Sequence, residues 1–176
     1  MLLQLAHQIW KGHLKKGDRV IDATCGNGYD AEFLSKFELG HLYLFDIQEI
    51  ALERSRQRVG NLSNISFHLA SHSSFDPSLA PISLIVYNLG YLPGGDKSLT
   101  TQAETTLMSF EMGLQLLEKE GLLSAMLYPG HEEGEREECA ILSWAKSLSS
   151  KDFSISHSKM INRSKAPSIL LIKKLR

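Results

Sequence analysis

The segment VIDATCGNGYD, residues 20–30, constrains the fold more than any other part of this chain. A short apolar run ends at an acidic residue, Asp22, and two glycines spaced one residue apart follow it. An amphipathic pattern then begins at about Ala31. This order predicts a buried parallel strand, a tight turn and a helix, because Gly26 and Gly28 can adopt backbone conformations that other residues avoid. Such a turn binds a nucleotide-like cofactor at the carboxyl end of a strand.

Acidic residues at two strand ends indicate which cofactor fits this turn. Asp22 would repel the pyrophosphate of a dinucleotide, whereas it suits the ammonium and sulfonium groups of S-adenosylmethionine. The next predicted strand ends at Asp46, where this architecture holds a ribose diol. We therefore expect S-adenosylmethionine. The alternative is that Asp22 and Asp46 only cap strand ends around an ordinary turn.

Composition limits the function classes. A length of 176 residues with 43% hydrophobic and 22% charged residues is typical of one globular domain with a sizeable core. No apolar run reaches the length of a membrane span, and Met1–Trp10 lacks the basic start and cleavage site of a signal peptide, so we expect a cytoplasmic protein. Cys25 and Cys139 are too few for a disulfide framework or a metal site, and Cys25 is interpreted as a small space-filling residue.

Charge is distributed unevenly, although the net charge is only −1. The last 18 residues hold six basic side chains and no acidic one: Lys159, Arg163, Lys165, Lys173, Lys174 and Arg176. An acidic run over residues 132–138 opposes them. A polarised molecule of this kind can present a basic face to phosphates, and a plainly solvated tail is the alternative.

Short apolar strands alternate with helical patterns along the whole chain. We expect strands at 19–22, 41–46, 65–69, 82–88, 121–128, 153–160 and 169–173, and helices over 1–10, 29–37, 47–59, 100–118 and 132–148. Alternation of this kind requires a mostly parallel sheet with right-handed crossovers. The prediction is one α/β domain over residues 1–176, with a seven-stranded Rossmann-like sheet, helices on both faces and a C-terminal antiparallel hairpin.

The loop after the fourth predicted strand, NLGYLPGGDK, resembles the Asn-Pro-Pro-Tyr loop of amino-group methyltransferases in its spacing of Asn88 and Tyr91. In that resemblance the Asn88 side-chain oxygen and the Leu89 carbonyl accept hydrogens from the target amine, and Tyr91 stacks on the target base. An accepting pair of this kind aims the nitrogen lone pair at the methyl group, and positioning is most of what a methyl transfer needs. Leu89 and Gly90 replace the two prolines. The alternative is a flexible glycine loop in which Asn88 is a turn residue.

Three further loops carry candidate groups. His131 follows the fifth predicted strand, and it is either a general base, as a side chain that titrates near neutrality, or an exposed residue at a helix start. Ser71 and His72 follow the third strand, where this fold contacts adenine. The hairpin loop carries polar groups that can reach substrate or phosphate, or that form a plain exposed turn: Asn162, Arg163 and Lys165.

Taken together, the motifs DATCGNGYD, NLGYLPGGDK, YPGHEEG and Asn162-Arg163 resemble the YtqB/MnmM family over nearly all of the chain. The resemblance implies a class I S-adenosylmethionine-dependent tRNA methyltransferase. Its substrate would be the aminomethyl group of a wobble uridine, 5-aminomethyl-2-thiouridine, which becomes 5-methylaminomethyl-2-thiouridine. Methylation of rRNA or of a small-molecule or protein amine is the alternative enzyme hypothesis. A nucleotide-binding regulatory domain is the non-enzyme hypothesis, for which the Asn88/Tyr91 loop has no evident use.

The fold and the resemblance together predict the site residues. Cofactor-binding residues are Asp22, Thr24, Gly26, Asn27, Gly28, Asp30, Asp46, Gln48, Ser71, His72 and Asn88. Catalytic residues are Asn88, Tyr91, His131 and Asp96, with His131 or Asp96 accepting the proton of an amine whose pKa desolvation lowers. Substrate-binding residues are Tyr91, Lys97, Asn162, Arg163 and Lys165. The lysine and arginine side chains among them contact the phosphates of a tRNA anticodon stem-loop. We expect no metal, and both a monomer and a homodimer remain open.

Overall fold

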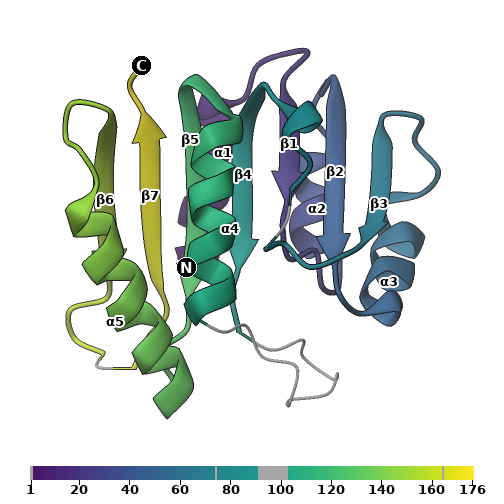
Figure 1. The fold of residues 1–176 in the computed structure, drawn as a ribbon. Coiled ribbons are helices and arrows are strands. Elements are labelled where there is room, and N and C mark those ends of the chain that lie inside the picture. The colour runs from purple at the N-terminus through teal and green to yellow at the C-terminus, as the bar shows by residue number, and fades with distance from the viewer. Residues whose placement is uncertain (1, 74, 91–102, 164) are drawn as a thin grey trace.

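Strands and helices alternate in the computed structural model, which describes residues 2–73, 75–90, 103–163 and 165–176 (Figure 1). The strands are β1 (Arg19–Asp22), β2 (His41–Asp46), β3 (Ile65–Leu69), β4 (Ile82–Asn88), β5 (Leu117–Leu127), β6 (Phe153–Lys159) and β7 (Ser168–Lys174). The helices are α1 (Leu2–His13), α2 (Tyr29–Leu34), α3 (Glu49–Val59), α4 (Ala103–Leu116) and α5 (Glu132–Ser147), with a 3₁₀ turn at Pro77–Leu79. The predicted sequence of elements is confirmed.

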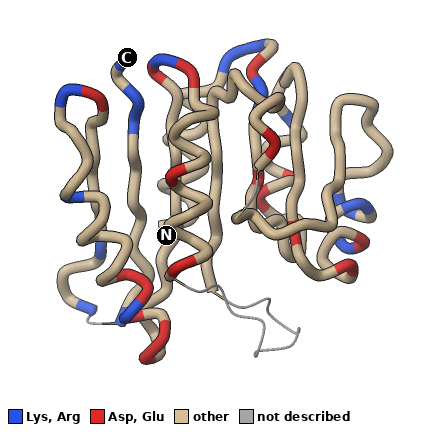
Figure 2. The backbone as a smooth tube through the Cα atoms, in the orientation of Figure 1, with Lys and Arg blue, Asp and Glu red and all other residues tan. Residues whose placement is uncertain are grey.

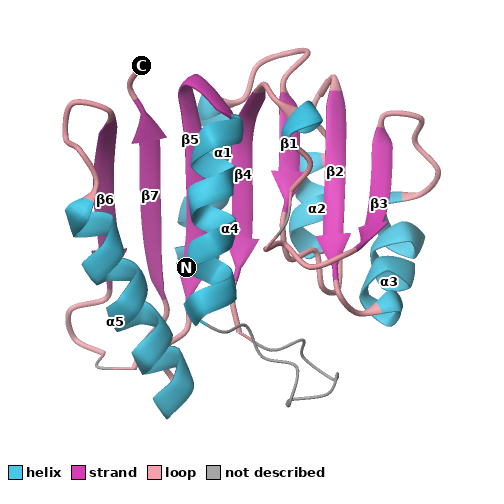
Figure 3. Cartoon of the chain, viewed as in Figure 1, coloured by secondary structure: helices cyan, strands magenta, loops and turns pink. Residues whose placement is uncertain are grey.

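The seven strands of the described ranges form one sheet in the order β3-β2-β1-β4-β5-β7-β6. The first five strands are parallel, and β7 pairs antiparallel with both β5 and β6, which confirms the predicted C-terminal hairpin (Figure 3). The direction in which strands are added reverses between β1 and β4, which lie side by side with Asp22 opposite Val86. In open α/β sheets ligands bind at such a reversal, outside the carboxyl ends of the strands.

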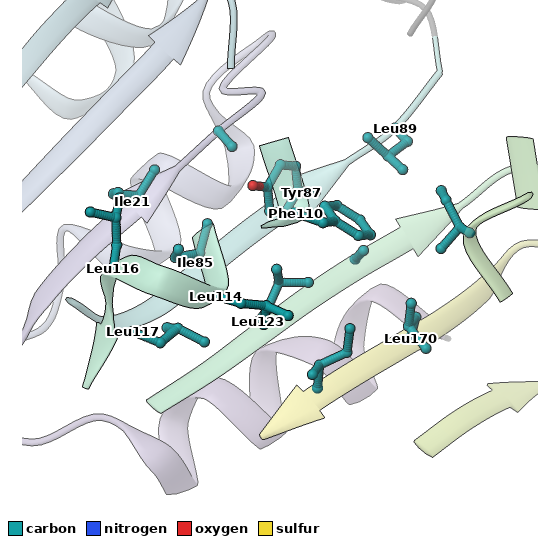
Figure 4. Packing of buried hydrophobic residues seen from close by; sticks show 14 of the residues in the cluster. Ile21, Ile85, Tyr87, Leu89, Phe110, Leu114, Leu116, Leu117, Leu123 and Leu170 are labelled. Carbon is teal, nitrogen blue, oxygen red and sulfur yellow. The ribbon is translucent and has the colours of Figure 1, made fainter. Parts of the chain in front are cut away.

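Two hydrophobic clusters cover the two faces of the sheet. On one face α1, α2 and α3 bury apolar side chains such as Trp10, Leu34 and Leu52 against the strands. On the other face α4 and α5 pack on the sheet, and Figure 4 shows the rings of Tyr87 and Phe110 together in that cluster, with their centroids 4.7 Å apart. Burial of both faces holds the carboxyl edge of the sheet rigid, because close-packed interiors deform little.

Several element boundaries differ from the predicted ones by one to four residues, and the ends of α2 and β5 show the physical reasons. Helix α2 ends at Leu34 and not at residue 37, because the next residues form tighter turns, with Lys36 N donating to Phe33 O and Phe37 N to Leu34 O. Strand β5 begins at Leu117 and not at residue 121, since Leu117 pairs with Ile82 before the register shifts. Neither difference moves a carboxyl end of the parallel strands.

No helix within the described ranges is long and apolar enough to cross a membrane. The described residues also contain no group of three or more His, Cys, Asp or Glu side chains arranged to hold a metal ion.

Candidate functional site

Three carboxylates interact around the turn that follows β1. Asp22 is almost completely buried at the end of the strand, where its Oδ1 accepts a 3.2 Å hydrogen bond from the backbone N–H of Thr24. Its Oδ2 is buried without a hydrogen-bond partner among the described residues. Burial raises the pKa of Asp22 well above its ordinary value of 3.8, and the charges of Asp30 and Asp46 raise it further. Crowded carboxylates of this kind favour a cationic ligand, which would relieve their repulsion.

The glycine turn is held against the end of β2. Gly26 and Gly28 have φ angles of 50° and 78°, in the left-handed region that favours glycine. The Asp46 carboxylate accepts backbone hydrogen bonds from Gly26 at 3.0 Å and from Gln48 at 2.9 Å. A Cβ atom on Gly28 would lie only 2.7 Å from Cα of Ser55, so that helix α3 packs directly on the turn. The spacing of the two glycines therefore reflects both backbone conformation and close packing.

Two other residues of the turn have structural contacts. Asn27 faces α3, where its Oδ1 accepts from Arg54 and its carbonyl from Arg58, both at 3.0 Å. Cys25 is buried, and burial together with the neighbouring Asp22 charge raises the pKa of its thiol. A neutral buried thiol is a poor nucleophile, in agreement with the interpretation of Cys25 as a space-filling residue.

The backbone at the end of β4 is held from both sides. The N–H of Asn88 donates a 2.7 Å hydrogen bond to Oγ1 of Thr24, and the N–H of Leu89 donates to the carbonyl of Met126 on β5 at 3.1 Å. Gly90 has a φ of 120°, which only glycine adopts readily. These contacts hold the backbone where Leu89 and Gly90 replace the two prolines of the resembled loop. Three predicted residues, Tyr91, Asp96 and Lys97, lie outside the described residues.

The side chain of Asn88 reaches the cofactor turn. Its Nδ2 donates to Oδ2 of Asp30 at 3.3 Å, and it shares a hydrogen bond with the Tyr128 side chain. The other oxygen of Asp30 lies 2.7 Å from Nε2 of His7, on α1. Sequence reasoning did not single out His7. A signal was present, because His7 stands next to Ala6 and three residues before Trp10, which belong to the apolar stripe of this helix.

Two predicted histidines have different environments. His131 is the N-cap residue of α5, and its Nδ1 accepts a 3.1 Å hydrogen bond from the backbone N–H of Gly134. His72 is buried after β3, and burial lowers its pKa to about 4, so it is neutral at physiological pH. Its Nδ1 has no hydrogen-bond partner in the described part of the chain. Ser71, beside it, shares a 2.9 Å hydrogen bond with Ser73.

The basic residues of the C-terminal segment separate into two groups (Figure 2). Because β7 runs antiparallel to β5, the hairpin loop lies at the carboxyl edge of the parallel strands, with three predicted residues exposed there: Asn162, Arg163 and Lys165. Lys165 lies 3.6 Å from Glu135. Lys173 and Arg176 lie toward the opposite edge, where they pair with Glu120 at 2.7 Å and Asp152 at 2.6 Å. Of these two groups, only the hairpin-loop residues lie on the side of the candidate site.

Comparison with known proteins identifies the family of the chain and its fold. The family model described as "Putative rRNA methylase" matches residues 42–174. A relative from Arabidopsis thaliana, "tRNA (mnm(5)s(2)U34)-methyltransferase, chloroplastic", is 34% identical over 96% of this chain and 68% of its own length.

Two solved structures have nearly the same fold. A "putative rRNA-methylase" from Clostridium thermocellum superposes with a TM-score of 0.92 at 30% identity, covering 98% of this chain and 97% of that one. A "putative methyltransferase" from Streptococcus mutans, solved in complex with SAH, has a TM-score of 0.88 at 34% identity and the same coverage. The chain therefore belongs to the rRNA methylase family and has the fold of a class I S-adenosylmethionine-dependent methyltransferase.

Proposed function

We propose that the protein is an S-adenosylmethionine-dependent N-methyltransferase that acts on the aminomethyl group of a tRNA wobble uridine. It converts 5-aminomethyl-2-thiouridine to 5-methylaminomethyl-2-thiouridine. The observation that carries the proposal is the 3.3 Å hydrogen bond between Asn88 and Asp30, since it joins a loop suited to an amine with the turn suited to the cofactor. The relative from Arabidopsis thaliana, whose name states this tRNA activity, supports the choice of substrate.

The turn after β1 has groups that fit the cofactor. The buried Oδ2 of Asp22, which lacks a partner among the described residues, suits the positive charge of the methionine end. Asp46 and Gln48 at the end of β2 suit the ribose, and Ser71 and the neutral His72 suit the adenine. The remaining cofactor-binding residues are the turn itself and its neighbours: Thr24, Gly26, Asn27, Gly28, Asp30 and Asn88. When bound, S-adenosylmethionine supplies an electrophilic methyl group and leaves as a neutral thioether.

Asn88 and Leu89 prepare the amine for methylation. A primary aliphatic amine is mostly protonated at neutral pH and then has no lone pair, so it must lose a proton as it is desolvated. Oδ1 of Asn88 and the Leu89 carbonyl then accept the two N–H groups and direct the lone pair. Both backbone amides here are held, by Thr24 and Met126, so the geometry costs little to maintain during the reaction. Tyr91 stacks on the uracil ring in this proposal.

The proton acceptor is assigned to Asp96 in preference to His131. Because Nδ1 of His131 accepts from Gly134, its neutral ring carries the hydrogen on Nε2. A further proton could enter only at Nδ1, at the expense of the cap on α5. His131 is therefore better suited to hold the start of the helix.

The RNA partner is supported by the hairpin loop. Arg163 and Lys165 are exposed at the same edge of the sheet as Asn88, where they can contact the phosphates of the anticodon stem-loop, together with Asn162 and Lys97. The family description favours rRNA as the second candidate substrate.

The substrate is tested with methyl-labelled S-adenosylmethionine and the full-length protein. Total tRNA lacking the wobble methyl group, purified rRNA and a simple alkyl amine are offered in parallel, and the nucleosides are identified by mass spectrometry. Labelled 5-methylaminomethyl-2-thiouridine in the tRNA sample alone is the expected result. Label in rRNA, or in the amine alone, would replace the proposed substrate while keeping the enzyme class.

A further inference from the structure

Three side chains from distant parts of the sequence form a continuous chain of hydrogen bonds. Nε2 of His7 on α1 lies 2.7 Å from Oδ1 of Asp30, and Oδ2 of Asp30 accepts from Nδ2 of Asn88 at 3.3 Å. Asp30 is only 7% exposed, so both of its oxygens depend on these contacts more than on water. The chain links the N-terminal helix to the loop after β4.

The contact with Asp30 determines which way the Asn88 amide faces. Nδ2 of Asn88 donates to Oδ2 of Asp30 at 3.3 Å, so the nitrogen of the amide faces Asp30. The amide oxygen then points away from Asp30. Tyr128 also shares a hydrogen bond with this side chain, and because that bond favours the ionised form of the phenol, the Asn88 NH₂ group is its donor. The lone pairs of the amide oxygen therefore remain for other donors.

His7 in turn fixes Asp30. Because the carboxylate accepts, Nε2 of His7 donates to it and compensates part of the cost of its burial. The imidazole ring is held by stacking on Phe33, with ring centroids 4.0 Å apart and an angle of 11° between the planes. It also lies 5.0 Å from the ring of Trp10. Without His7, Asp30 would face the nearby charge of Asp22 with fewer compensating contacts.

We propose that His7 and Asp30 are positioning residues, which hold the Asn88 amide with its oxygen directed toward the amine that is methylated. The inference rests on the proposed function of Asn88. It assigns to α1 a part in the reaction, and it gives Asp30 an orienting role in addition to its proposed place in the cofactor site.

Two substitutions of His7 separate hydrogen bonding from packing. His7→Gln keeps an N–H donor near Asp30 but loses the aromatic ring, whereas His7→Phe keeps the stacking on Phe33 but loses the donor. His13→Ala is the matched control, because His13 is also on α1 and its Nε2 bonds the carbonyl of Ser83 at 2.9 Å, far along the helix from Asp30. We expect kcat for tRNA methylation to fall about tenfold in His7→Phe. We expect kcat to fall by about threefold or less in His7→Gln and to be unchanged in His13→Ala.

The binding constants distinguish positioning from a contact with the ligands. The KM for tRNA and the Kd for S-adenosylmethionine, measured by calorimetry, should stay within about twofold in all three variants, since only the amide orientation is altered. An equal kcat in His7→Phe and His7→Gln would overturn the proposal. A loss of cofactor affinity that accounts for the fall in rate would overturn it as well.

A spectroscopic readout does not depend on activity. In ¹⁵N-labelled protein the side-chain NH₂ signals of Asn88 are identified by their absence in Asn88→Asp. They should shift in His7→Phe, return toward the wild-type position in His7→Gln and stay in place in His13→Ala. Unchanged signals in His7→Phe would contradict the orienting role. If the wild-type protein methylates no tRNA, the proposed function fails, and these signals still decide whether His7 positions Asn88.

Discussion

The backbone N–H of Asn88 donates a 2.7 Å hydrogen bond to Oγ1 of Thr24, across 64 residues of sequence. Thr24 belongs to the turn after β1 and Asn88 to the end of β4, the two strands between which the sheet reverses its order. One hydroxyl thus fixes the distance between the groups proposed for the cofactor and the groups proposed for the amine. Methyl transfer requires little of a protein except this kind of fixed distance.

Replacement of Thr24 should affect stability and rate together. Thr24→Val keeps the shape but leaves the N–H of Asn88 without its acceptor, so the free energy of unfolding in urea should fall by about 1–3 kcal/mol. The methylation rate should fall as well, because the Asn88 backbone is released. Thr24→Ser, which keeps the hydroxyl, is the control and should retain the wild-type stability and methylation rate. Equal free energies of unfolding in Thr24→Val and Thr24→Ser would show that the hydrogen bond from Asn88 contributes nothing to stability.

Asp22 should lower the stability of the ligand-free protein at neutral pH. Its folded pKa is raised above 3.8, so between 3.8 and that raised value the folded state holds a proton that the unfolded state has lost. Stability from this group therefore declines as pH rises through this range. Asp22→Asn should be more stable than the wild type by about 1 kcal/mol at pH 7, with little gain at pH 4. It should also bind S-adenosylmethionine more weakly.

Urea denaturation at the two pH values, with calorimetry of cofactor binding, measures both effects of Asp22→Asn. A variant that is less stable than the wild type at pH 7 would show that the Asp22 charge is compensated within the folded protein.

His72 should make stability depend on pH in the opposite direction. Its pKa is lowered from 6.5 to about 4, so the unfolded state binds the proton more tightly. The stability from the neutral ring is fully present above pH 6.5 and is lost as pH falls toward 4, by up to about 3 kcal/mol. Denaturation of His72→Phe and of the wild type at pH 7 and pH 5 isolates this contribution, because the carboxylates are common to both. If the free energy of unfolding had the same pH dependence in His72→Phe and the wild type, the predicted contribution of His72 would be disproved.

Contacts with RNA phosphates should depend on the hairpin loop. The double variant Arg163→Ala/Lys165→Ala should bind an anticodon stem-loop more weakly, and the slope of log affinity against log salt should decrease by about 2. Lys173→Ala is the matched control, since Lys173 lies toward the other edge of the sheet and pairs with Glu120. Fluorescence anisotropy at several salt concentrations gives the slopes. Equal slopes for the double variant and the control would place the RNA elsewhere.

The alternation of short apolar runs with helical patterns along the chain was sufficient to predict most of the fold. Strands such as β1 and β4 are nearly continuous apolar runs bounded by an acid or an amide, and their limits are as expected. The start of β5 was missed because its first residues include Glu118, Lys119 and Glu120, which carry no apolar pattern. There the pairing of Leu117 with Ile82 extends the strand, a tertiary effect that local sequence does not reveal.

Positions in the candidate site were predictable where they lie at the carboxyl ends of strands, which the sequence pattern locates. The carboxylates and glycines around β1 and β2 follow from strand ends, as does Asn88. His7 could not be found in this way, because its partner Asp30 is 23 residues away and the contact exists only once α1 has packed on the sheet. Likewise, the cap that His131 forms with Gly134 depends on side-chain geometry that the sequence leaves open.

The most direct measurement of the central claim is the comparison of Asn88→Ala with the wild type in two assays. Calorimetry gives the Kd for S-adenosylmethionine, and a single-turnover assay on tRNA lacking the wobble methyl group gives the rate of methyl transfer. If Asn88 orients the amine, the Kd should change by less than about threefold while the rate falls about a hundredfold. Equal loss of cofactor binding and methylation would show instead that Asn88 is structural.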